Sequence, residues 1–172
     1  PHLIQRLSKL TTLDLSNNPI SLENSDTLPF NSPIKAAFTN IMHHGDRHSQ
    51  NTVMITLLTS NCTADELFTI TGMTRPKSYN HAKRISRYGK KRTQHSILRL
   101  LTLLKVSVIE DASWLGQVTE LELQGGQLSV LPPEILRLPK LQHLNLSNNQ
   151  LTRLPANLGN ALPQTSFDLR WN

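Results

Sequence analysis

The sequence lacks the features that stabilise small secreted domains or carry a chain across a membrane. It has one cysteine, Cys62, among 172 residues, so no disulfide can form within the chain. This favours a reducing compartment, and we expect the protein to be cytoplasmic. No run of 18 apolar residues occurs, so no membrane-spanning helix is predicted. The aromatic content of 5 % is low, but 37 % hydrophobic residues suit a folded protein.

Acidic residues are missing from one long segment. Residues 67–109 contain ten Lys or Arg and no Asp or Glu, while the net charge of the whole chain is +6. The basic balance therefore belongs to this segment, and a surface of this kind is suited to binding anions.

The sequence does contain a 23-residue period in its last third. When residues 118–172 are shifted by 23, positions of the same character coincide. The first set is Val118, Leu121, Leu123, Gly126 and Leu128; the second is Leu141, Leu144, Leu146, Asn149 and Leu151; the third is Gln164, Phe167, Leu169 and Asn172. A fixed period of about 20–29 residues with this pattern is the signature of a leucine-rich repeat.

The spacing has a physical reason. Leu144 and Leu146 are two residues apart, so in a short strand they share one face while Asn145 points to the other. The shared face stacks on the next repeat, which builds the core between repeats. Asn149 follows the strand, where an Asn side chain can satisfy backbone groups of the turn. Gly126 keeps this turn but loses the side-chain bonds.

A second motif follows each strand. Residues 131–138 and 154–162 share Leu-Pro, two variable residues and then Ile or Leu. The chain therefore resembles the 23-residue leucine-rich repeats of the Ras-suppressor, plant intracellular and bacterial type, over roughly residues 1–22 and 115–172. The resemblance implies an α/β solenoid with short parallel strands.

One further repeat lies at the beginning of the chain. Its columns are Leu10, Leu13, Leu15, Asn18 and Ile20, and Pro1, Ile4 and Leu7 align with Pro132, Ile135 and Leu138. We therefore expect the chain to begin in mid-repeat, as a fragment whose targeting signal could be missing.

Residues 33–114 carry no repeat register and read as helices. Helix starts are predicted at Ser32-Pro33, at Thr63 with its capping box to Glu66, at Pro76 and at Thr93. Gly72 is expected to end the second of these. The apolar run at 51–60 is too short to separate helix from strand. The last helix is apolar nearly all round, so the end of a repeat stack or a partner must cover it.

These patterns predict three regions: truncated repeats in 1–32, a basic helical insertion or module in 33–114, and repeats in 115–172. The fold class is α/β, a solenoid interrupted by a mainly helical insertion. An insertion between repeats and a module between two arrays both remain open.

Within the basic segment, residues 63–85 resemble a helix-turn-helix. A second helix of that kind lies in the major groove of DNA. The resemblance implies phosphate and base contacts by Arg75, Lys77, Asn80, Lys83, Arg84 and Arg87. Ser78 and Ala82 stand where such motifs bury larger residues, and no wing follows. Nucleic-acid binding is therefore the alternative function, and a solvated basic face is the favoured interpretation.

No constellation of residues indicates catalysis or a cofactor. His43, His44 and His48 lie close together, but no nearby Cys completes a metal-ligand set. Cys62 has no His placed to activate it. No glycine-rich phosphate loop occurs. We expect no enzyme, no cofactor and no metal.

The remaining candidate site is the strand face opposite the stacked leucines. In a solenoid its side chains align on the concave surface. The expected partner-binding residues are Asp14, Ser16, Glu120, Glu122, Gln124, His143, Asn145, Ser147, Asp168 and Arg170. The column through Asp14, Glu122, Asn145 and Asp168 is mostly acidic or amide, which favours a polar or basic protein partner. The sequence therefore predicts a protein-interaction scaffold.

Overall fold

A computed structural model of the protein describes residues 11–12, 32–86 and 93–172. The chain divides into two compact units, an N-terminal unit (Pro1–Arg75) and a C-terminal unit (Pro76–Asn172). The boundary between them falls inside the segment 33–114. The three-region division at 32 and 114 stays a prediction.

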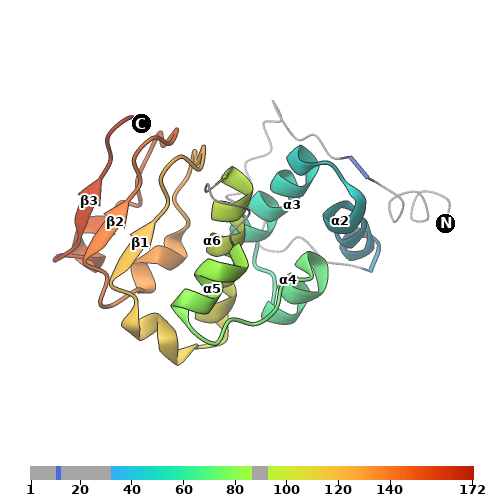
Figure 1. Cartoon of the computed structure of the whole chain (residues 1–172), viewed down its shortest axis with the longest axis horizontal. Helices are drawn as coiled ribbons and strands as arrows, with labels where there is room; N and C mark the ends of the chain where they lie inside the picture. Colours follow the sequence, from blue (N-terminus) through green and yellow to red (C-terminus); the bar gives the residue numbers. More distant parts are fainter. Residues whose placement is uncertain (1–10, 13–31, 87–92) are drawn as a thin grey trace. The chain divides into compact units, whose positions relative to one another are not determined.

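The described part of the N-terminal unit is helical from residue 32 onwards (Figure 1). Helix α2 (Ser32–His44) contacts both α3 (Arg47–Thr59) and α4 (Ala64–Thr71). The core between them consists of apolar side chains with no exposed surface: Ile41, Val53, Met54, Leu57, Leu67 and Ile70. The undecided apolar run at 51–60 lies in α3 up to Thr59, so it is helical.

Local sequence sets the ends of α4 as predicted. The Thr63 side chain accepts a hydrogen bond from the Glu66 backbone N–H, and the Glu66 carboxylate accepts one from the Thr63 backbone N–H at 2.9 Å. This capping box is confirmed, and the bond from Thr63 lowers the pKa of Glu66. Gly72 ends the helix in the left-handed conformation, with φ 62°.

The C-terminal unit begins with α5 (Tyr79–Ser86), three residues later than the predicted first-turn Pro76. That prediction is wrong because Ser78 caps the helix. Its hydroxyl accepts a hydrogen bond from the His81 backbone N–H at 3.2 Å, and its carbonyl accepts one from Ala82 at 2.9 Å.

Three short strands form a parallel sheet in the order β1 (Glu120–Glu122), β2 (His143–Asn145) and β3 (Ser166–Asp168). Leu121 pairs with Leu144, and Leu144 pairs with Phe167, so the register of the sheet equals the 23-residue period of the sequence. The structure is thus mixed α/β, with the strands confined to the C-terminal unit among the described residues.

Short helical segments connect the strands and close the core. The segment η2 (Ser113–Gln117) precedes β1, η3 (Pro133–Arg137) lies between β1 and β2, and α7 (Leu158–Ala161) lies between β2 and β3. The buried side chains that meet in this core are Val118, Leu121, Leu123, Leu131, Ile135, Leu138, Leu144, Leu146 and Leu158. Strand and connection together therefore form each repeat.

Helix α6 (Gln94–Ile109) covers the first of these repeats (Figure 1). Its apolar side chains from Ile97 to Val106 are buried on all sides of the helix, whereas Ile109 at its end is exposed. The helix contacts α5, η2 and η3. The Lys105 ammonium lies 3.8 Å from the Glu134 carboxylate in η3. A Cβ atom added at Gly126 would lie 3.0 Å from two carbons of Ile97. The helix predicted to need a cover therefore packs directly on the repeat that contains β1.

Candidate functional site

The candidate site is the face of the sheet that points away from the buried leucines. In each strand the middle residue is more buried than the first, as the two-residue alternation requires. The parallel register places the outward side chains in two rows across the strands. We call these the outer row (Glu120, His143 and Ser166) and the central row (Glu122, Asn145 and Asp168). The predicted residues of β1, β2 and β3 are thus brought together.

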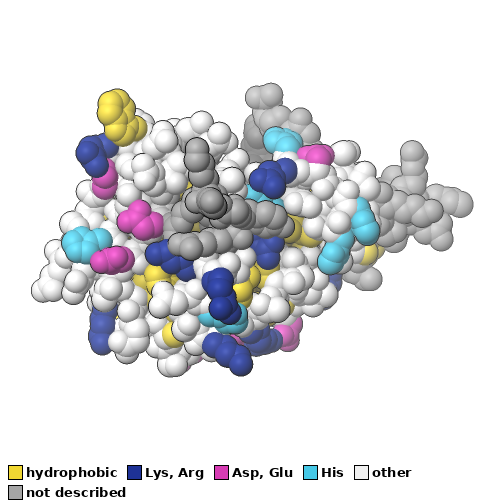
Figure 2. Space-filling model, viewed as in Figure 1, with side chains coloured by type: hydrophobic (Ala, Val, Ile, Leu, Met, Phe, Trp, Pro, Cys, Tyr) yellow, Lys and Arg dark blue, Asp and Glu magenta, His cyan; other side chains and the backbone are white. Residues whose placement is uncertain are grey.

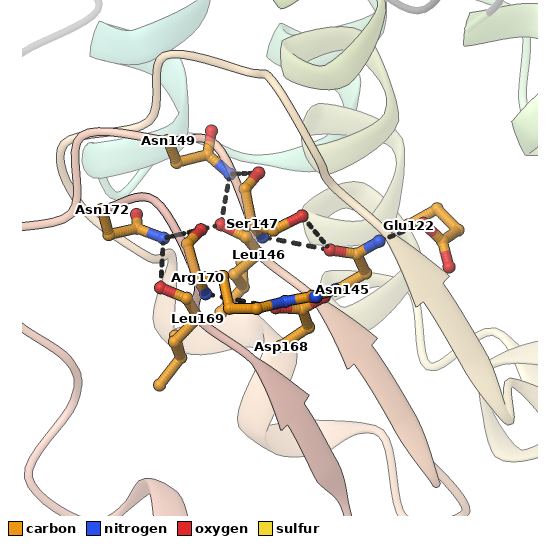
Figure 3. A network of polar contacts seen from close by, with 9 residues as sticks. All are labelled: Glu122, Asn145, Leu146, Ser147, Asn149, Asp168, Leu169, Arg170 and Asn172. Carbon is orange, nitrogen blue, oxygen red and sulfur yellow. Dashed lines mark hydrogen bonds and ion pairs between the residues drawn. The ribbon is translucent and has the colours of Figure 1, made fainter.

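Two members of the central row, Glu122 and Asn145, are linked by a hydrogen bond, and the third, Asp168, is held by Arg170 (Figure 3). Asn145 donates its amide to the Glu122 carboxylate at 2.9 Å, between neighbouring strands. Its amide oxygen accepts from the Ser147 hydroxyl at 2.7 Å and from the Ser147 backbone N–H at 3.0 Å. Both ends of the Asn145 side chain are therefore held, and the row is ordered before any partner binds.

The outer row is more exposed. The His143 ring nitrogen Nδ1 lies 2.6 Å from the Ser166 hydroxyl, which also donates to the Gln142 carbonyl at 3.1 Å. Glu120 is exposed and forms no ion pair or hydrogen bond with the described residues. This carboxylate is consequently available to a ligand.

The predicted residues that follow the strands differ in their exposure. Gln124 and Arg170 are exposed, but Ser147 is buried, with 4 % of its surface accessible. Ser147 follows the central strand, and its hydroxyl and its backbone N–H both bond to the Asn145 amide oxygen. Ser147 orients Asn145 and cannot itself present a surface to a partner. The predicted residues Asp14 and Ser16 lie outside the described residues.

Asp168 and Arg170 neutralise each other at the edge of the face. Arg170 donates two hydrogen bonds to the two carboxylate oxygens of Asp168, at 2.9 and 2.7 Å, and its backbone N–H donates a third at 3.1 Å. These bonds lower the pKa of Asp168 to about 2 from the ordinary 3.8 and raise the pKa of Arg170. Unpaired negative charge on the face therefore lies over β1, on Glu120 and Glu122.

This pair gives a pH prediction. Because the pKa of Asp168 is lowered in the folded state, the stabilisation by the pair is present above pH 3.8 and is lost as the pH falls towards about 2. Titration of the Asp168 carboxyl carbon by NMR should give a midpoint near 2, and Arg170→Ala should move it up towards 3.8. A wild-type midpoint near 3.8 would show that the pair does not form in solution.

Two asparagines 23 residues apart, Asn149 and Asn172, bond to the backbone of the turns that follow the strands. We call this pair the asparagine ladder. The Asn149 amide oxygen accepts hydrogen bonds from the backbone N–H groups of Gly126 and Leu128, at 2.9 and 3.1 Å. Its amide nitrogen donates to three carbonyls, those of Leu123, Leu146 and Ser147. Asn172, 23 residues on, repeats this pattern, and its amide oxygen accepts a hydrogen bond from the Leu151 backbone N–H. Its amide nitrogen donates to the carbonyls of Leu146, Leu169 and Arg170 (Figure 3). The prediction that Asn149 satisfies backbone groups of its own turn is confirmed. Its hydrogen bonds to the preceding repeat were not predicted.

One exposed residue near the face was missed by sequence reasoning. Trp171 is 81 % exposed and follows Arg170 directly. The 23-residue period could have identified it, because Trp171 aligns with Asn148 and Gly125, and Asn and Gly are common in turns whereas Trp is not. In the space-filling view, acidic and histidine side chains gather over the strands, with a hydrophobic side chain at the end of that face (Figure 2).

The basic residues of the alternative site do not form one unit. Arg75 belongs to the N-terminal unit, where its guanidinium pairs with Asp65 at 2.8 Å and lies over the Phe68 ring at 4.8 Å. The remaining described members, Lys77, Asn80, Lys83 and Arg84, belong to the C-terminal unit. Helices α4 and α5 of the supposed helix-turn-helix thus fall in different units. Arg87 lies outside the described residues.

Two searches of the described residues bear on other functions. No group of three or more His, Cys, Asp or Glu side chains with the geometry of a metal site occurs in the part of the chain that the structure describes. In the same part, no helix is both long enough and apolar enough to span a bilayer.

Comparison with protein families agrees with the repeat geometry. Residues 116–172 match a family described as leucine rich repeat, and residues 9–31 match a second family of the same description. No curated protein and no solved structure matches the chain. Leucine-rich repeats are commonly modules for protein–protein interaction and are generally not enzymes. These two segments therefore belong to the leucine-rich repeat family.

Proposed function

We propose that the protein is a non-enzymatic interaction scaffold, a leucine-rich solenoid that binds a partner protein on its concave strand face. The observation that carries this proposal is the pair of outward rows on the sheet. Six side chains from three strands lie in register there, and the central row is held by hydrogen bonds. A surface that is ordered before binding loses little conformational entropy on association, which favours recognition.

The chemistry of the face indicates the charge of its partner. Glu120 and Glu122 form no ion pair with the described residues, while Asp168 is neutralised by Arg170. A partner with basic side chains would therefore pair with carboxylates whose charge is not already neutralised. We place this interaction in the cytoplasm, because the single cysteine, Cys62, is buried in the N-terminal unit and makes no disulfide.

A capture experiment tests the proposal. The wild type and the combined variant Glu122→Lys, Asn145→Lys and Asp168→Lys are immobilised and compared for the proteins that they retain. We expect the triple variant to lose the specific partner, because like charges then oppose a basic surface. Retention of every partner by the triple variant would show that this face is not the binding site.

A matched variant distinguishes nucleic-acid binding by the basic segment from protein binding by the strand face. Reversal of Lys83, Arg84 and Arg87 to Glu changes the basic segment and leaves the strand face intact. We expect this variant to keep the partner. If short duplex DNA binds the wild type at low salt and this variant abolishes that binding, the basic segment is a nucleic-acid site.

A further inference from the structure

Trp171 occupies a backbone position that does not suit it. Its φ is 61°, and the residues one and two periods earlier, Asn148 and Gly125, have φ of 56° and 71°. All three therefore occupy the left-handed region. Gly and Asn adopt this region readily, whereas a bulky aromatic residue there is strained. Such outliers cluster at functional sites, so an outlier of this kind supports a hypothesis of function.

The exposure of Trp171 is a property of its column. Asn148 is also exposed, although it has the turn of β1 on one side and the turn of β3 on the other. A Cβ atom at Gly125 would meet only the Asn148 amide nitrogen, at 3.8 Å. Side chains in this column thus line the rim of the strand face and stay outside the core. Trp171 contributes a large apolar surface at that rim.

Trp171 and the carboxylates without an ion pair, Glu120 and Glu122, lie at opposite ends of the same face. Trp171 follows β3, whereas Glu120 and Glu122 lie in β1, two strands away. Neighbouring strands are about 4.8 Å apart, so two strand spacings separate them by about 10 Å across the sheet. Trp171 also lies three residues beyond the end of β3, which adds about 10 Å along the strand and makes the diagonal to Glu122 about 14 Å. An extended peptide rises about 3.3 Å per residue, so about four to five residues cross the distance to Glu122. One short segment can contact both ends.

We propose that Trp171 anchors an arginine-bearing extended segment of the partner protein, which crosses the strands to Glu122 and Glu120. This inference rests on the proposed function and names the partner's chemistry. Arginine fits both ends, because its planar guanidinium stacks on an aromatic ring and pairs with a carboxylate through two hydrogen bonds. The compact ammonium group of lysine satisfies the carboxylates but stacks less well.

Labelled arginine–serine, lysine–serine and glutamate–serine peptides are the probes, with fluorescence anisotropy of the full chain as the measurement. We expect the arginine peptide to bind most tightly, the lysine peptide less tightly and the glutamate peptide not at all. In a Trp114→Phe background, which leaves Trp171 as the only tryptophan, the arginine peptide should change the tryptophan emission. Equal binding of all three peptides, or unchanged emission, would overturn the proposal.

Trp171→Asn is the matched variant, because Asn is the residue of the same column in the preceding repeat. We expect it to weaken arginine-peptide binding by about threefold to thirtyfold. Its melting temperature should be equal to or above that of the wild type. A clear fall in melting temperature would assign Trp171 a structural role and overturn the proposal.

Failure of this inference differs from failure of the proposed function. If Trp171→Asn leaves the peptide affinities unchanged while the triple lysine variant still loses the captured protein, the anchor is wrong and the binding face stands. If neither change affects peptide binding or capture, both are wrong.

Discussion

Replacing Asn149 with alanine is expected to lower the free energy of unfolding of the C-terminal unit by about 3–5 kcal/mol. The Asn149 side chain makes five hydrogen bonds to backbone groups, and the residue is 8 % exposed. Alanine would leave those groups without their partner, and each buried unsatisfied group costs about 1–3 kcal/mol. Both tryptophans, Trp114 and Trp171, lie in this unit, so urea unfolding followed by tryptophan fluorescence reports on it directly.

The neighbouring Asn148 supplies the control. It is exposed and has φ 56°, so Asn148→Gly keeps the backbone conformation and removes no hydrogen bond that supports the core. We expect a change of less than about 0.5 kcal/mol. Asn172→Ala should give an intermediate loss, because water can replace its bonds. If Asn149→Ala and Asn148→Gly unfold alike, the asparagine ladder does not stabilise the repeats.

The second large effect is expected at Gly126. Asn at this position would match the later repeats, yet we expect Gly126→Asn to destabilise the C-terminal unit by about 3 kcal/mol. Its Cβ would lie 3.0 Å from Cδ1 and Cγ2 of Ile97 and 3.2 Å from the Asn149 amide oxygen. The new side chain would therefore collide with α6 and with the ladder. Unfolding in urea, again followed by tryptophan fluorescence, measures the loss.

Gly125→Asn is the matched control for Gly126→Asn. It also introduces the residue that the next repeat carries, but its Cβ has no close neighbour, and Asn tolerates φ of 71°. We expect a change within about 1 kcal/mol. The double variant Gly126→Ala with Ile97→Ala should lose less unfolding free energy than the two single variants lose together. The contact between the new Cβ atom and Ile97 is then absent. Additive losses would contradict the packing of α6 on this turn.

Gly126 illustrates how far the sequence predicts this fold. The 23-residue period predicted which residues pair in the strands, because each repeat obeys the same local pattern. It also marked Gly126 as an exception in the asparagine column. The reason lies in Ile97, 29 residues earlier and in a segment without any repeat, so no pattern within the repeats could supply it.

For the candidate site, the sequence predicted the outward residues of the strands but not the properties of the residues that follow them. Alternation in a short strand places Glu122, Asn145 and Asp168 outward, and the register brings them into one row. Two properties depend on the ends of the strands, which alternation does not set. Ser147 is buried beyond β2 against the Asn145 side chain, and the left-handed φ of Trp171 becomes visible only in the backbone. Both lie where regular structure stops.

The most direct test of the binding face is site-specific photo-crosslinking in cells. A benzoyl-phenylalanine placed at Glu120, which is exposed and forms no bond within the described residues, is compared with the same group at Arg84 on α5. We predict a discrete protein adduct from position 120 that disappears when Glu122, Asn145 and Asp168 are changed together to lysine, and no such adduct from position 84. An adduct from position 84 alone, or one from position 120 that survives the triple change, would contradict binding through the strand face.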